Sequence, residues 1–126
     1  MRTILLASCL VLVSACGDEH GEVHVQVTAA PPTTSTAGTA FDVSWQVHND
    51  TEDELHHTEI RFCVGADVAD CGMGEPDTFT SATGSMADGT ITAAVTIDDA
   101  GTYTLVAWSH VGDNPHVSDA YGVDVQ

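Results

Sequence analysis

The chain has 126 residues, with 19 acidic side chains against two basic ones and a formal net charge of −17 at pH 7. That length supports one domain with a single core. Binding to nucleic acid through phosphates needs several cationic side chains, and Arg61 is the only Arg or Lys after Arg2. The composition therefore excludes a nucleic-acid partner, and it also disfavours charge-driven docking on anionic lipid.

The first fifteen residues have the layout of a secretory signal peptide. Residues 1–3 form a short positive segment, residues 4–13 form an apolar stretch, and small residues follow. The stretch is too short for a transmembrane helix, which needs about 20 apolar residues. We therefore expect residues 1–15 to be an export signal.

This segment ends in Val13-Ser14-Ala15-Cys16, which resembles the lipobox of bacterial lipoproteins. The resemblance implies cleavage before Cys16, whose thiol then carries a diacylglycerol. Acyl chains hold a protein firmly at a membrane because each buried methylene adds about 0.8 kcal/mol. Residues 16–22 are then a lipidated tether, and the membrane is a partner through that anchor. The predicted location is the cell envelope, with the outer membrane favoured over the inner because Gly17, not aspartate, follows the cysteine.

The remaining cysteines form an even pair. Cys9 leaves with the signal and Cys16 is lipidated, so Cys63 and Cys71 are left in an oxidising compartment. A disulfide is expected there, worth roughly 2–3 kcal/mol in the chain-entropy description. A zinc site is the alternative, but the spacing lacks the paired C-x-x-C of such sites.

From residue 23 onward apolar and polar side chains alternate, which is the period of half-buried strands. Strands are expected over residues 23–27, 41–48, 58–64, 91–97, 103–110 and 117–125. Trp45 and Phe62 are assigned to the core, and Val64 to the same inward face as Phe62. The stretch 65–89 is rich in Gly, Asp, Ser and Thr, so we expect loops with one or two weak edge strands there.

Short strands separated by turns indicate an all-β, antiparallel β-sandwich of about seven strands over residues 23–126. The segment Asp99-Ala100-Gly101-Thr102-Tyr103-Thr104-Leu105 resembles the D-x-G-x-Y-x-C segment of immunoglobulin-like domains. That resemblance implies that the Tyr103 hydroxyl bonds back to the chain at a corner between sheets. Leu105 stands at the cysteine position, so hydrophobic packing replaces the inter-sheet disulfide. Residues 37–49 are also similar to fibronectin-III-like domains, and neither resemblance implies an enzyme.

Histidines and carboxylates suggest a second function, a periplasmic zinc or copper module. Imidazole and carboxylate both bind these metals, and the candidate ligands are His24, His48, His56 and His57. His24 and His48 lie on strands that should pair. Adjacent histidines on a strand point to opposite faces, so His56 and His57 share an ion only if the chain bends.

Other chemistries lack their motifs. No G-x-S-x-G nucleophile elbow occurs, and no histidine follows either cysteine as blue-copper chemistry needs. Calcium could use Asp67 and Asp70, or Asp98 and Asp99 with Asp113, but neither set has the EF-hand order. We therefore assign no catalytic residue, no enzyme activity and no cofactor. The first hypothesis is a binding or structural module with a protein or glycan partner, for which Trp108 is a candidate anchor unless a loop covers it.

Overall fold

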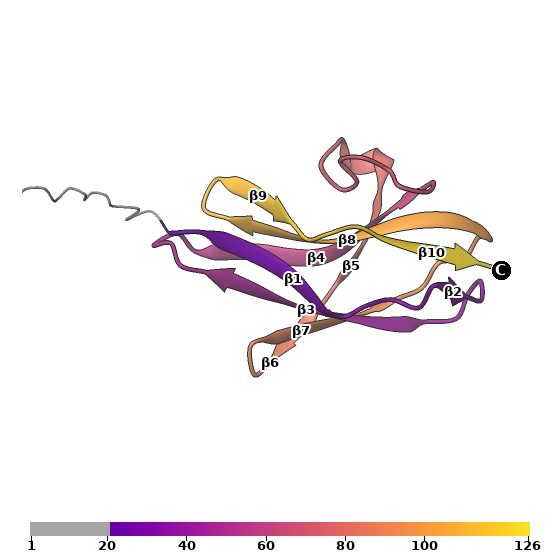
Figure 1. The fold of residues 1–126 in the computed structure, drawn as a ribbon, viewed down its shortest axis with the longest axis horizontal. Coiled ribbons are helices and arrows are strands. Elements are labelled where there is room, and N and C mark those ends of the chain that lie inside the picture. Colours follow the sequence, from indigo (N-terminus) through magenta and orange to yellow (C-terminus); the bar gives the residue numbers. More distant parts are fainter. Residues whose placement is uncertain (1–20) are drawn as a thin grey trace, which may run out of the picture.

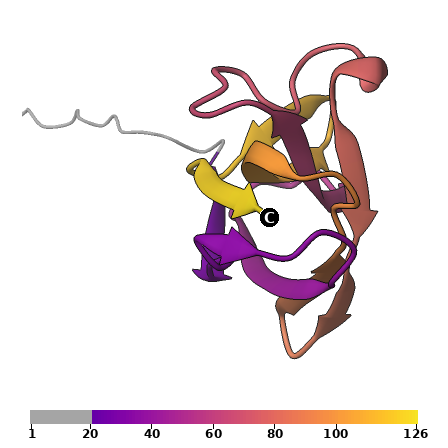
Figure 2. The ribbon, with the colours of Figure 1, turned by 90° about the vertical axis from the view of Figure 1, so that its right-hand side faces the viewer.

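Two β-sheets packed face to face form the domain in the computed structural model, which describes residues 21–126 (Figures 1 and 2). The predicted export signal, lipobox and Cys16 lie outside the described residues. The smaller sheet has the strand order β1-β3-β7-β6. Its members are β1 (Val23–Ala29), β3 (Phe41–Asn49), β7 (Thr90–Val95) and β6 (Ser85–Ala87).

The larger sheet has the order β2-β10-β8-β4-β5, with β9 also paired to β8. Its members are β2 (Thr34–Ser35), β10 (Tyr121–Val125), β8 (Gly101–Val111), β4 (Leu55–Val64), β5 (Thr80–Thr83) and β9 (Asn114–Val117). A single 3₁₀ turn, η2 (Pro76–Thr78), interrupts the long loop between β4 and β5. Every strand pair is antiparallel except the parallel pair of β2 with β10. The chain is an immunoglobulin-like, antiparallel β-sandwich, as the sequence predicted.

Trp45 is the largest side chain of the core and is completely buried. It packs with residues from both sheets, among them Ile60, Ile91 and Leu105. Its indole Nε1 donates to the Thr58 hydroxyl on the opposite sheet at 2.8 Å, because a buried indole N–H needs a partner. The prediction that Trp45 and Phe62 lie in the core is confirmed.

The corner before β8 has the geometry that the immunoglobulin resemblance implied. The Tyr103 hydroxyl donates to the backbone carbonyl of Asp99 at 2.8 Å. Leu105 is 1% exposed and belongs to the main core. Hydrophobic packing therefore occupies the place of the inter-sheet disulfide.

Three details differ from the sequence prediction. The expected last strand is broken into β9 and β10, because Ser118 is buried between them and its hydroxyl accepts a hydrogen bond from the Ala107 amide at 2.9 Å. Val64 was predicted to face inward but is 81% exposed, since it is the last residue of β4 and lies past the core. Residues 34 and 35, which lie outside the expected strands, form β2, which belongs to the larger sheet and pairs with β10.

The two ends of the described chain lie at opposite ends of the long axis. In Figure 1, β1 begins at the left end and the C-terminus lies at the right end. The loop between β4 and β5 projects above the larger sheet. Among residues 21–126 there is no helix long and apolar enough to span a bilayer.

Candidate functional site

Three charged or titratable side chains lie in a row on the outer face of β4. Strand alternation sends His57, Glu59 and Arg61 to that face, opposite the inward Ile60 and Phe62. Arg61 Nε donates to Glu59 Oε2 at 2.5 Å, and His57 Nε2 lies 2.5 Å from Glu59 Oε1. Glu59 is only 6% exposed. A buried carboxylate of this kind is stable only when it is paired and hydrogen-bonded.

The surroundings of Glu59 favour its ionised form on balance. Burial raises the pKa of the Glu59 carboxyl, but the hydrogen bonds from Arg61 and His57 and the charges of both outweigh burial. The pKa of Glu59 is therefore held below its ordinary value. The carboxylate remains ionised at neutral pH and is a fixed acceptor between the two side chains.

The Arg61 guanidinium joins this row to the loop above it. It lies 3.5 Å from the centre of the Trp108 ring and 4.2 Å from the centre of the Phe79 ring, so both aromatic faces contribute cation–π attraction. It also donates to the Gly72 carbonyl. Gly72 has φ +83°, and a Cβ there would lie 3.0 Å from Arg61 Cδ. Glycine is therefore needed for the loop to close over the arginine.

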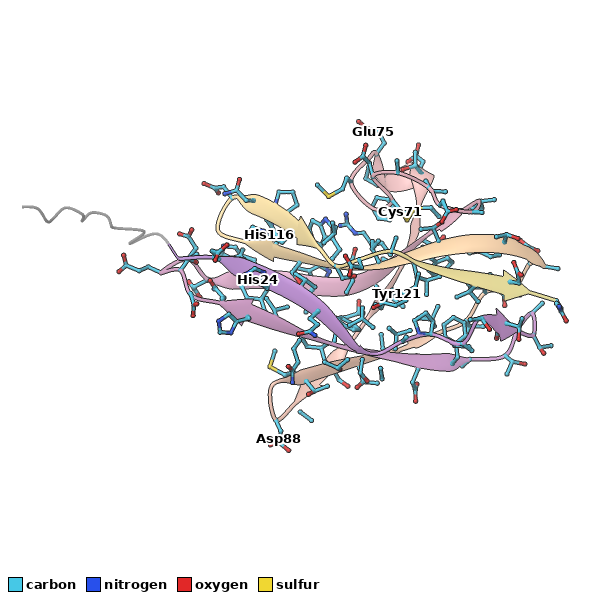
Figure 3. The ribbon with its side chains drawn as sticks, viewed as in Figure 1. His24, Cys71, Glu75, Asp88, His116 and Tyr121 are labelled. Carbon is cyan, nitrogen blue, oxygen red and sulfur yellow. A yellow bond between two sulfur atoms is a disulfide. The ribbon has the colours of Figure 1, made fainter. Side chains whose placement is uncertain are left out.

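The same loop is fixed by the predicted disulfide. Cys63 and Cys71 are bonded, with their Cα atoms 5.9 Å apart. Both are buried and form a small second core on the outer face with Val106, against which Val68 and Phe79 pack. Figure 3 labels Cys71 at the base of the projecting loop. The disulfide and Arg61 thus hold one loop against one sheet face.

Beyond the covered part of this face lies a surface of aromatic rings. We name His56, His57, Trp108 and His110 the histidine–tryptophan surface. The ring centres of His56 and His110 are 5.7 Å apart, those of His110 and Trp108 are 5.8 Å apart, and those of His57 and Trp108 are 6.2 Å apart. The rings therefore form a continuous chain across β4 and β8.

A β-bulge explains how two adjacent histidines reach one surface. The register of β4 against β8 shifts between Leu55 and His57, and a bulge re-aims the side chains beside it. His56 then lies against His110, while His57 bonds to Glu59. The bend that His56 and His57 need in order to reach one face is present, although the two rings contact different partners.

His24 and His48 are neighbours, as predicted from the pairing of the first two long strands. They are directly opposed in the register of β1 with β3, and their ring centres are 6.5 Å apart. Glu22 lies 3.8 Å from the His24 ring nitrogen, and Asp50 lies 3.1 Å from that of His48. Within residues 21–126, however, no three His, Cys, Asp or Glu side chains are already arranged to hold a metal ion.

Trp108 is partly covered rather than freely exposed. The Arg61 guanidinium from the neighbouring strand lies over its ring, and the Phe79 ring of the loop packs on the same guanidinium. No local pattern marks Phe79 or Gly72 as contacts of Arg61, since both lie in a stretch without periodicity. The i, i+2 spacing of His57, Glu59 and Arg61 on one strand face was the available signal for their contact.

Comparison with known proteins supports the fold. No family model matches the chain, and no curated protein matches it. The chain is similar to a superoxide reductase (neelaredoxin) from Ignicoccus hospitalis, with 14% identity and a TM-score of 0.51, over 82% of this chain and 80% of that one. It is also similar to the Lin-41 filamin domain, with 12% identity and a TM-score of 0.47 over 81% and 91% of the chains. Murine CRIg has 10% identity and a TM-score of 0.40 over 84% and 98%. The likeness to the reductase, at 14% identity, concerns the fold alone.

Proposed function

We propose that this chain is a lipid-anchored lipoprotein of the bacterial cell envelope, whose immunoglobulin-like domain binds a protein or glycan partner through the histidine–tryptophan surface. The anchor rests on the lipobox resemblance at Cys16. The binding role rests on one observation above all, the chain of four rings across β4 and β8.

Two properties of this surface suit binding. Aromatic and imidazole rings offer contact area at small entropic cost, and tryptophan is common at the energetic centre of interfaces. Neighbouring side chains also hold this surface in place, because Glu59 bonds to His57 and Arg61 packs on Trp108. A rigid surface loses less side-chain freedom when a partner binds.

The position of the surface also fits an anchored module. His110 is next to Val111, and Val111 lines the same groove as Gly21 and Glu22, the first described residues. The rings therefore lie toward the end of the domain where β1 begins, which is the end nearest the proposed anchor. Partners held in the same membrane would meet this end first.

The anchor is tested by fractionating cells that carry the wild-type chain, Cys16→Ser or the control Cys9→Ser, grown with a labelled fatty acid. We expect label and membrane association in the wild type and in Cys9→Ser, and an unlabelled protein that is unprocessed or soluble in Cys16→Ser. Label that persists in Cys16→Ser would refute the anchor.

The binding role is tested separately by cross-linking in intact cells. His56→Ala combined with His110→Ala should remove a defined cross-linked species, whereas the control His24→Ala combined with His48→Ala should retain it. An identical cross-linking pattern in both double variants would exclude the histidine–tryptophan surface as the contact.

A further inference from the structure

We infer that the outer face of β1 and β3 binds one zinc-class divalent metal ion through His24, His48, Glu22 and Asp50. These four side chains form a cross-strand group that is separate from the histidine–tryptophan surface. Both donor types belong to the ligand set of zinc.

The backbone places the four side chains on one face. His24 is opposite His48 in the strand register, and the Asp50 amide donates to the Glu22 carbonyl at 3.0 Å. The ladder therefore continues one step past Val23 and Asn49. Because side chains alternate along strands, the two carboxylates stand beside the two imidazoles as a square on the solvent side. Figure 3 labels His24 near the end of the domain where β1 begins.

The distances within each half of the group already suit a metal ion. Zinc binds imidazole nitrogen and carboxylate oxygen at about 2.0–2.2 Å, so neighbouring ligand atoms of one tetrahedral ion lie about 3.3 Å apart. The His48 Nε2 to Asp50 Oδ2 distance is 3.1 Å, and the His24 Nε2 to Glu22 Oε2 distance is 3.8 Å.

The two halves have to approach each other by a small movement. The ring centres are 6.5 Å apart, whereas two imidazoles on one tetrahedral ion have centres about 5 Å apart. All four side chains are between 61 and 71% exposed, so rotation about their side-chain bonds meets no packing. The ion itself supplies the attraction that brings the ligands together, as expected for a site that is not assembled beforehand.

The electrostatic setting also favours a cation. The charge of the chain is −17, and Arg61 is the only Arg or Lys among residues 21–126. Arg61 is committed to Glu59 on the other sheet. A surface of one sign raises the local concentration of counter-ions, so the four ligands lie where divalent cations accumulate.

The experiment is calorimetric titration of the purified full chain in detergent with zinc chloride alone. We expect one zinc ion per chain with a micromolar Kd. The variant His24→Ala with His48→Ala should abolish binding, and Glu22→Gln with Asp50→Asn should weaken it by about tenfold or more. All four positions are exposed, so circular dichroism should show an unchanged fold.

Two matched controls separate this site from its alternatives. His56→Ala with His110→Ala removes the other close histidine pair, and Asp77→Asn with Asp88→Asn removes two exposed charges elsewhere. Both controls should bind zinc like the wild type. Absence of binding in the wild type, unchanged binding in His24→Ala with His48→Ala, loss in either control, or one zinc ion per two chains would overturn the inference.

Discussion

Replacement of Arg61 by methionine tests the role of the buried row on β4 most severely. Methionine keeps much of the length and apolar stem of arginine, so it can remain between Trp108 and Phe79. It removes the charge that offsets the burial of Glu59, and it removes the donor to the Gly72 carbonyl. The variant therefore tests the loss of the ion pair with little change in packing.

The expected magnitude follows from burial. Glu59 is 6% exposed, and removal of one partner of a buried pair costs about 3–5 kcal/mol because the other charge is left uncompensated. An exposed ion pair contributes only about 0–1 kcal/mol. His57 still bonds to Glu59 in the variant, so we expect a loss of about 3 kcal/mol, at the lower end of the buried range. That is a large part of the 5–15 kcal/mol typical of a folded domain.

The assay is urea unfolding at pH 7, followed by tryptophan fluorescence, of the wild type, Arg61→Met, Glu59→Gln and the double variant. The loss of unfolding free energy in the double variant should be smaller than the sum of the losses in the two single variants, because the double variant leaves no unpaired charge. Hydrogen exchange should become faster in the loop between β4 and β5. A loss below about 1 kcal/mol in Arg61→Met, or additive single losses, would refute a buried and coupled pair.

Three further predictions concern stability. Folding lowers the pKa of Glu59 from an ordinary 4.5, so its ionised form contributes stability above that pH, and this contribution is lost as the pH falls through the lower folded value. In urea titrations the difference in unfolding free energy between the wild type and Glu59→Gln should therefore become smaller below about pH 4.5. Tyr103→Phe should cost about 1 kcal/mol in thermal unfolding, since it removes only the hydrogen bond to the Asp99 carbonyl, and an unchanged Tm would mean that the corner bond contributes nothing. Cys63→Ala with Cys71→Ala should lower the free energy of unfolding by roughly 2–3 kcal/mol and expose the loop to protease, whereas equal protease resistance would show that the disulfide is not needed to hold the loop.

The strands were predictable because a sandwich buries one face of each strand. The alternation of apolar and polar residues around Trp45 assigns each neighbour to the inward or the outward face, and β3 lies where that pattern predicts a strand. The proximity of His24 and His48 was also predictable, because β1 and β3 are consecutive long strands that pair and both histidines lie on their outward faces. The disulfide followed from counting cysteines, and its formation between Cys63 and Cys71 is confirmed.

The break in the last strand was not predictable from periodicity. Ser118 is a small polar residue in a stretch that continues the apolar alternation, and nothing local shows that its hydroxyl replaces a ladder partner for Ala107. The exposure of Val64 depends on where the opposite sheet ends. Both features depend on the packing of distant elements.

The candidate site also has a part that strand spacing predicts and a part that it does not. The row of His57, Glu59 and Arg61 could be placed on one face from strand spacing alone. The approach of Phe79 and Gly72 to Arg61 could not, because they belong to a loop whose path is fixed by long-range contacts. The bulge that turns His56 toward His110 depends on the register of two strands far apart in sequence.

Lipid anchoring at Cys16 is tested most directly by mass spectrometry of the protein extracted from membranes. We expect the first peptide to begin at Cys16 and to carry the mass of a diacylglycerol on its thiol. A mature chain that begins at another residue, or that has a free thiol at Cys16, would contradict the lipid-anchored assignment.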